Sequence, residues 1–180
     1  MPLHLDCGLC VVRSWRPGDE DSLTRHANDR GVWLNLRDRF PHPYTRPDAE
    51  QWVRFAAGAN PETNFAIAVD GEAVGGIGLM LHDDVERCSA EIGYWLGRTF
   101  WGRGLATAAV RALTAHAFAT HGLTRVYALP FADNTASLRV LEKAGYRCEG
   151  RLRRSAIKDG RVRDQVVYAL TDEDVRPRIG

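Results

Sequence analysis

The sequence predicts a mixed α/β fold in a single domain that spans residues 1–180. A chain of this length suits one domain with a sizeable hydrophobic core. Strand-like and helix-like segments follow one another with no linker, internal repeat or low-complexity tract between them. A first strand and its helices precede an antiparallel meander, and a helix, a strand, a second helix and a hairpin complete the chain. This order predicts one mixed sheet packed against helices.

Proline and glycine separate the elements of the N-terminal part. Alternating apolar residues predict a first strand over 9–15. Asp19 follows a Pro–Gly pair and is suited to cap the first helix. The segment 37–50 contains three prolines and is expected to be a loop. A second helix begins at its end, at Pro47–Asp48, and stops at Gly58.

The middle of the chain predicts a meander followed by a long helix. The strands are expected at 63–70, 72–82 and 88–97. Asp70–Gly71 forms a tight turn between the first two of them. After a glycine-rich loop, a helix is expected to run to about His121, where Gly122 serves as its C-cap.

The C-terminal part predicts a strand, a helix and a hairpin. The strand covers 125–131, and the helix covers 133–146 with Asp133 or Asn134 as its cap. Two further strands flank the turn Asp159–Gly160. The last ten residues, 171–180, are expected to form a loose tail.

The composition is that of an ordinary globular protein and argues against several classes of partner. The formal net charge is +1, so neither nucleic acid nor an anionic membrane is expected as the main partner. No apolar run approaches the roughly 20 residues of a membrane span, and the first residues lack the pattern of a signal peptide. We therefore expect a cytoplasmic protein.

The four cysteines give a weak signal. Cys7 and Cys10 form a CxxC, whereas Cys88 and Cys148 stand alone. A zinc site would need two more ligands at suitable spacing, and a redox CxxC should open a helix rather than precede a strand. We expect incidental free thiols and no metal, with metal or redox chemistry at the CxxC as the alternative.

The stretch FWGRGLATAAVRAL, residues 100–113, places Gly102 and Gly104 at the start of a helical pattern. Glycine lets the backbone lie close to a ligand, and the unpaired N–H groups of a helix start attract anions. A phosphate site is therefore expected here. A Rossmann fingerprint is disfavoured because Thr107 replaces its third glycine and no acidic residue ends the next strand, and the Gly-Lys-Ser/Thr of a P-loop is absent. A glycine-rich turn without a ligand is the remaining alternative.

Two further motifs, AEIGYWLG…WGRGLAT and DNTASLRVLEKAGY, stand on either side of the strand expected at 125–131. Together they resemble the GNAT superfamily of acyl-CoA-dependent N-acetyltransferases, and within it the RimJ/RimL-like branch. The branch's helix pattern is matched throughout, by Asn134, Ser137, Val140, Leu141, Glu142, Lys143, Gly145 and Tyr146. Segments of the N-terminal half resemble the branch as well. The resemblance implies a GNAT-type fold, with a mixed, mostly antiparallel sheet, one splayed strand pair and helices on both faces.

The resemblance also implies acetyl-CoA as the co-substrate and locates its binding residues. The family's pyrophosphate loop falls on Gly102, Arg103, Gly104, Leu105 and Ala106, although Thr99 replaces the family's usual Gln or Arg at its first position. The pantetheine arm is expected to pair with the free edge of the strand residues Ile92, Gly93, Tyr94, Trp95 and Leu96. Asn134 matches a helix residue near the same arm.

Two residues are candidates for catalysis. Only the neutral form of an amine attacks a thioester, so a general base is useful, and Glu91 matches the position of the catalytic glutamate in several relatives. Alternation places Glu91 on the face of Gly93 and Trp95, where an apolar neighbour would raise its pKa. An ion pair with an arginine is the alternative. Many relatives use a tyrosine at the place of Leu141 to assist the leaving thiolate, and the resemblance to the RimL-like branch, which has a serine three residues after the Asn, implies that Ser137 takes that role here. A local backbone hydrogen bond is the alternative for Ser137.

The acceptor is the least determined part of the prediction. Trp33, Phe40 and Tyr44, with His42, lie in the segment that walls the acceptor site in this branch, although loop aromatics often pack locally. A protein N-terminus and a small amine both remain open as acceptors. A non-catalytic acyl-CoA-binding or regulatory module is the alternative function, and the resemblance also allows a homodimer.

Overall fold

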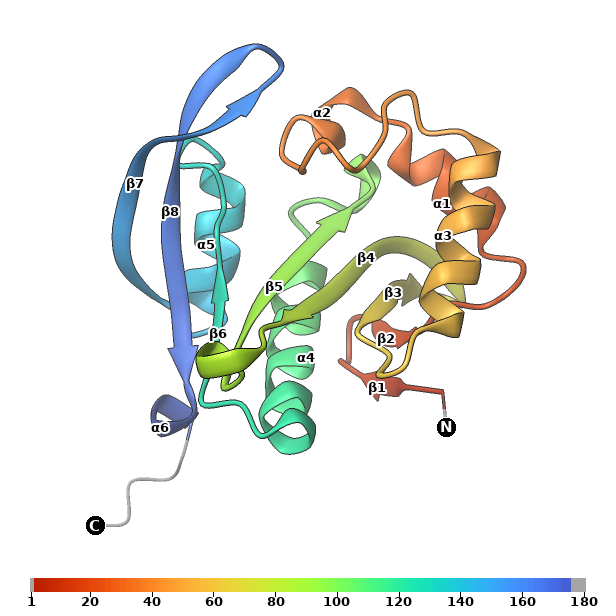
Figure 1. Ribbon diagram of the computed structural model, residues 1–180. Coiled ribbons are helices and arrows are strands. Elements are labelled where there is room, and N and C mark those ends of the chain that lie inside the picture. Colours follow the sequence, from red (N-terminus) through yellow and green to blue (C-terminus); the bar gives the residue numbers. More distant parts are fainter. Residues whose placement is uncertain (1, 176–180) are drawn as a thin grey trace.

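The computed structural model describes residues 2–175, and one eight-stranded sheet runs through them in the order β1-β2-β3-β4-β5-β6-β8-β7 (Figure 1). The strands are β1 (His4–Asp6), β2 (Val11–Ser14), β3 (Asn64–Val69), β4 (Glu72–Leu81), β5 (Ser89–Leu96), β6 (Arg125–Ala128), β7 (Arg147–Lys158) and β8 (Arg161–Thr171). The helices are α1 (Glu20–Ala27), α2 (Arg30–Trp33), α3 (Arg46–Gly58), α4 (Leu105–His121), α5 (Thr135–Lys143) and α6 (Asp172–Val175). Short 3-10 turns cover Asp84–Glu86 and Arg98–Phe100.

Neighbouring strands are antiparallel throughout the sheet except for β5 and β6, which are parallel. A parallel pair needs a crossover between its strands, and α4 provides it. The predicted mixed, mostly antiparallel sheet is therefore confirmed. No helix in the part of the chain that the structure describes is long and apolar enough to cross a membrane.

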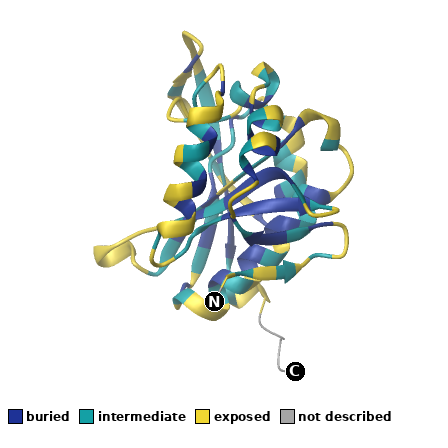
Figure 2. Cartoon of the chain, turned by 90° about the vertical axis from the view of Figure 1, so that its right-hand side faces the viewer, coloured by how far each residue is buried: buried dark blue, intermediate teal, exposed yellow. Residues whose placement is uncertain are grey.

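The two faces of the sheet carry separate apolar clusters, as β3 illustrates. Phe65 and Ile67 of β3 belong to the larger cluster, which includes the buried side chains of α4. Ala66, which points the other way, belongs to a smaller cluster with residues of α1 and α3. The strands between these layers are mostly buried (Figure 2). Helices therefore cover both faces, as predicted.

Glycines end the helices α3 and α4 and form the β3–β4 turn where the sequence predicts them, whereas the predicted cap of α1 differs. α3 ends at Gly58, and α4 ends at His121 with Gly122 in the left-handed region at φ +62°. Asp70 and Gly71 both have positive φ in the turn between β3 and β4. Asp19 occupies the N-cap position of α1, but its carboxylate receives two hydrogen bonds from buried Arg13 and does not cap the helix.

Two predictions about the chain ends need correction. The strand expected over 9–15 is shorter, Val11–Ser14, and a further strand, His4–Asp6, pairs with it. The tail expected to be loose from residue 171 is ordered up to 175, because Thr171 ends β8 and residues 172–175 form α6. The Thr171 amide and hydroxyl donate to Asp174 Oδ2, which fixes this turn. Residues 176–180 lie outside the described part of the chain.

Candidate active site

The parallel strands β5 and β6 separate soon after they meet. Their pairing covers Ser89–Glu91 and Arg125–Tyr127 only, and beyond Glu91 the strand β5 follows β4 while β6 diverges (Figure 1). The β6-facing edge of β5 from Ile92 to Leu96 is left without a strand partner, and a cleft of about 1380 Å³ is lined by these residues. Such an edge offers N–H and C=O groups to an extended ligand.

The glycine loop and the start of α4 line the same cleft. Gly102 and Gly104 have φ of +73° and +80°, and a Cβ at Gly102 would meet no atom within 4 Å. Gly104 is the N-cap of α4 and has no side chain to bond the first-turn N–H groups, which begin at Leu105 and Ala106. These free donors form the kind of anion site that the sequence predicts.

The two arginines beside this loop lie differently from each other. Arg103 lines the cleft, and its guanidinium lies 5.2 Å from the Phe100 ring centre. Arg98, at the start of the loop, instead contacts Asp29 at 4.0 Å and the ring of Trp101. Only Arg103 is therefore placed to add positive charge at the mouth of the glycine loop.

The first turn of α5 reaches β5 across the cleft. Asn134 caps the helix by accepting a hydrogen bond from the Ser137 amide at 3.2 Å. The Ser137 hydroxyl lies 2.8 Å from the hydroxyl of Tyr94 on β5. Burial raises the pKa of Tyr94 to about 12, with the hydrogen bond to Ser137 as a smaller, opposing influence. Tyr94 and Ser137 thus form a neutral hydroxyl pair inside the cleft.

Glu91 lies at the point where β5 and β6 separate, and it is held in an ion pair. Arg37, from the loop that follows α2, places Nη2 2.5 Å from Glu91 Oε1. The Glu91 side chain is only 12% exposed, whereas the guanidinium is half exposed. Trp95, the expected apolar neighbour, packs against Phe40 with ring centres 5.5 Å apart. The charged partner of Glu91 is therefore an arginine, the alternative that the sequence left open.

The predicted acceptor residues divide into two groups. Phe40 and Tyr44 line the cleft, and the aromatic side chains of α3, Trp52 and Phe55, extend their wall. Trp33 lies outside the residues that line the cleft: it stacks on His42 at 5.5 Å, and the Lys158 ammonium lies 3.7 Å from its ring centre. Trp33 therefore packs the loop against the end of β7.

The sequence reasoning missed four cations that shape the site. Arg37 and Arg39 line the cleft from the loop after α2. Lys158 is almost fully buried and bonds Asp38 at 2.8 Å, and Arg163 donates to the Leu34 carbonyl, so both connect the β7–β8 hairpin to that loop. Asp38 is 120 residues from Lys158 and Leu34 is 129 residues from Arg163, so no local pattern signals these contacts.

The other chemical features of the chain lie outside the cleft. Cys7 and Cys10 are free thiols that close a turn behind α4, where the Cys10 thiol donates to the Leu105 carbonyl at 3.7 Å. The acidic turn residues Asp83, Asp84 and Glu86 do not line the cleft. Among residues 2–175 no group of three or more His, Cys, Asp or Glu is arranged to hold a metal.

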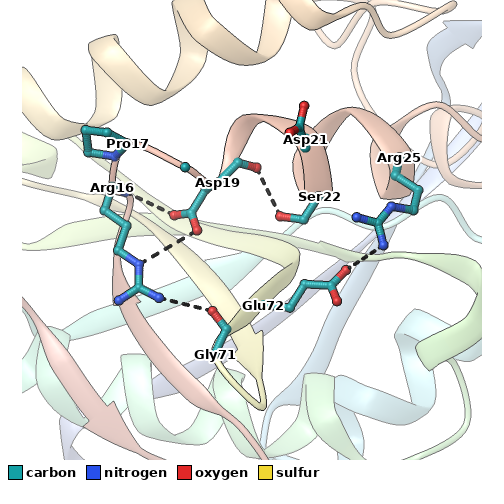
Figure 3. Close-up of a pocket in the computed structure, with 9 residues that line it drawn as sticks. Arg16, Pro17, Asp19, Asp21, Ser22, Arg25, Gly71 and Glu72 are labelled. Carbon is teal, nitrogen blue, oxygen red and sulfur yellow. Dashed lines mark hydrogen bonds and ion pairs between the residues drawn. The ribbon is translucent and has the colours of Figure 1, made fainter.

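A second, smaller cavity of about 350 Å³ lies beside the start of α1 (Figure 3). Its charged side chains are engaged with one another, with the backbone or, for Asp21, with Arg46 of α3. Asp19 contacts Arg16, Arg16 also donates to the Gly71 carbonyl, and Arg25 contacts Glu72 (Figure 3). These contacts join α1 to the β3–β4 turn, so the cavity is explained by structural ion pairs.

Comparison with known proteins decides the family. A family model described as an acetyltransferase (GNAT) domain matches residues 10–147. The chain belongs to the GNAT acetyltransferase family. Its catalytic activity is therefore that of an acetyltransferase, and its co-substrate is acetyl-CoA.

Individual relatives support the RimJ/RimL-like branch. This GNAT acetyltransferase is 40% identical over 166 residues to a protein of Bacillus subtilis named ribosomal N-acetyltransferase YdaF, covering 89% of this chain and 90% of that protein. It is 36% identical to the N-acetyltransferase p20 of Bacillus licheniformis, over 89% and 91% of the two chains. Mycobacterium smegmatis RimJ, solved with a CoA disulfide, superposes with a TM-score of 0.81 at 28% identity, over 98% of this chain and 88% of that one.

Proposed function

We propose that this acetyltransferase moves the acetyl group of acetyl-CoA to a primary amine by direct attack in a ternary complex. The observation that carries the proposal is the continuity of the cleft. One cleft is lined by the α4 start, by the free edge of β5 and by Glu91 with its aromatic wall. Donor and acceptor can therefore meet where β5 and β6 separate, without a covalent enzyme intermediate.

The donor is bound by backbone more than by side chains. The N–H groups from Gly102 to Ala106 hold the pyrophosphate, and Arg103 adds a charge at its edge. The pantetheine arm pairs with the free edge of β5, where Gly93 carries no side chain to obstruct it. Asn134 holds the first turn of α5 in place beside that arm.

Glu91 is the general base of the proposed reaction. It takes a proton from the incoming ammonium group, directly or through a water molecule, and the neutral nitrogen then attacks the thioester carbon. Arg37 orients the carboxylate through their contact of 2.5 Å. General-base assistance of this kind contributes roughly 10²–10⁴-fold to the rate.

Collapse of the tetrahedral intermediate forms the amide and breaks the C–S bond. A β5 backbone N–H near Ile92 or Gly93 donates to the oxyanion, a type of contact that contributes roughly 10²-fold or more. Ser137 donates a hydrogen bond to the departing sulfur, and this thiolate then takes up the second proton that the attacking nitrogen loses as the amide forms. Tyr94 holds the Ser137 hydroxyl from the other side, at 2.8 Å.

The acceptor we favour is the N-terminal amine of a protein. Support comes from the similarity to the protein named ribosomal N-acetyltransferase and to RimJ. The same similarity favours a cytoplasmic location. A small amine is the other acceptor that the cleft could take, and a homodimer remains a prediction from the resemblance.

Calorimetry and a thiol-release assay test the proposal together. Acetyl-CoA and free CoA should bind with similar affinity while ATP does not bind, because the β5 edge recognises the pantetheine arm that ATP lacks. Release of free CoA should then require an added amine from a panel of peptides and small amines. Binding of CoA with no transfer to any amine would support a non-catalytic acyl-CoA-binding module instead. If the protein bound no CoA, the glycine loop would not be a phosphate-binding site.

A further inference from the structure

Two guanidinium groups stand beside the single carboxylate at the point where the acceptor amine would enter. Arg37 and Arg39 both contact the sulfur of Met80, at 3.8 and 3.1 Å. Met80 on β4 lies directly opposite Glu91 on β5 in the sheet register. The two arginines are therefore anchored on one side chain next to the proposed base.

Arg39 is the unbalanced charge of this group. Arg37 is paired with Glu91, whereas no carboxylate of residues 2–175 lies within 4 Å of Arg39. A thioether sulfur is a weak acceptor and does not neutralise a guanidinium. The other acid on this side of the cleft, Asp48, is engaged by the amide and hydroxyl of Thr45.

An apolar surface continues from the arginines along α3. The tilted rings of Trp52 and Phe55 contact each other with ring centres 5.7 Å apart, and both residues line the cleft. Phe55 is 59% exposed, so part of this aromatic surface is open to solvent. The acceptor side of the cleft thus combines one uncompensated cation with an open aromatic face.

We propose that Arg39 binds a carboxylate of the acceptor, so that the enzyme selects primary amines that carry an anionic group and an apolar side chain close to the amine. The inference rests on the proposed function, since it concerns the acceptor of that reaction. It favours amino acids or N-terminal segments of this kind over polyamines.

Charge complementarity is the reason why an acceptor with a carboxylate is favoured over a polyamine. An acceptor amine enters as an ammonium group and meets Glu91, but Arg37 and Arg39 repel any further positive charge. The acids that could have attracted a polyamine, Asp83, Asp84 and Glu86, are outside the cleft. A carboxylate near the amine instead gains a charge-assisted hydrogen bond from Arg39.

The test compares amines that carry a carboxylate close to the amine with amines that do not. Thiol release is measured with acetyl-CoA and L-phenylalanine, phenethylamine or spermidine, for the wild type and Arg39→Gln. A pair of short peptides, one with Phe-Asp and one with Phe-Lys at the N-terminus, distinguishes a peptide source of the carboxylate from a free amino acid. Arg54→Gln is the matched control, because Arg54 is an exposed arginine of α3 that does not line the cleft.

We expect the wild type to favour the carboxylate-bearing acceptor of at least one pair by about tenfold in kcat/KM, since a hydrogen bond to a charged group is typically worth about that factor. Arg39→Gln should abolish this preference, chiefly by raising the KM of the carboxylate-bearing acceptor, and Arg54→Gln should retain the preference. Equal rates for both members of each pair, a preference for spermidine, or an unchanged preference in Arg39→Gln would overturn the inference while leaving the acetyltransferase proposal intact. CoA binding without transfer to any amine would overturn both.

Discussion

The phenol oxygen of Tyr94 lies 2.8 Å from the Ser137 hydroxyl and joins β5 to α5 across the cleft. If Ser137 assists the leaving thiolate and Tyr94 positions it, the two act as one unit. We expect Ser137→Ala to lower kcat by about tenfold or more with little change in the KM for acetyl-CoA. Tyr94→Phe should have a smaller effect of the same kind. Steady-state kinetics of the double variant provides the check: its kcat should match that of Ser137→Ala, and an additive loss would mean that the two hydroxyls act independently.

Glu91→Gln removes the proposed base while keeping the size of the side chain. The rate at neutral pH should fall by about 10²-fold, at the low end of general-base catalysis. The remaining rate should rise with pH towards the pKa of the amine, about 8 for a protein N-terminus and about 10 for an alkyl amine, because the neutral amine must now form in solution. A pH–rate profile measures this, with Glu86→Gln as a control outside the cleft. A wild-type profile in Glu91→Gln would exclude Glu91 as the base.

Gly102 and Gly122 form a matched pair for testing the glycine loop. Both have positive φ, +73° and +62°, and a Cβ at either one meets no atom within 4 Å. Each Gly→Ala change should therefore cost about 1 kcal/mol of folding stability through backbone strain. Only Gly102→Ala should also weaken CoA binding, because Gly102 lines the cleft and Gly122 does not. Denaturant unfolding measures the loss of stability, and calorimetry measures the CoA affinity. If Gly102→Ala and Gly122→Ala bound CoA with equal affinity, the pyrophosphate would not bind at the glycine loop.

The thiol of Cys7 should be unusually reactive near neutral pH. Its hydrogen bond with Cys10 is the main cause that lowers the pKa of Cys7 to about 7, and the same hydrogen bond, followed by burial, raises the pKa of Cys10. A lowered pKa populates the thiolate at lower pH, so alkylation of Cys7 should rise through pH 7 instead of near 8.5. Peptide mapping after iodoacetamide labelling measures this midpoint. Cys10→Ala should shift it upward, and an unchanged midpoint would show that Cys10 does not stabilise the thiolate.

Much of the fold could be predicted because the chain marks its own boundaries. Gly58, Gly122 and the Asp159–Gly160 turn are local signals, and each ends an element where expected. The strand His4–Asp6 was missed because three residues are too few to establish an alternating pattern. Similarly, the turn of helix after β8 depends on one hydrogen-bonded side chain, Asp174, within a polar segment.

The site could be predicted only where its residues follow one another in the sequence. The glycine loop and the Asn134–Ser137 turn are contiguous, and they line the cleft as expected. The partner of Glu91 is 54 positions away, and the partner of Lys158 is 120 positions away. Such pairs depend on how the loop after α2 lies over the sheet. That placement is a property of the assembled structure, so Trp33 was assigned to the cleft although it packs beside Lys158.

The unpaired edge of β5 also bears on how the protein avoids aggregation. A bare strand edge at the outside of a sheet is a template on which other polypeptides can assemble. Here the bare edge is internal, with β4 on one side and β6 diverging on the other, so a second sheet cannot approach it broadside. The outermost strands are protected differently: β1 has only three residues, and β7 carries several arginines. The unpaired edge of β5 can thus form hydrogen bonds with a narrow, extended ligand without causing aggregation by strand pairing between molecules.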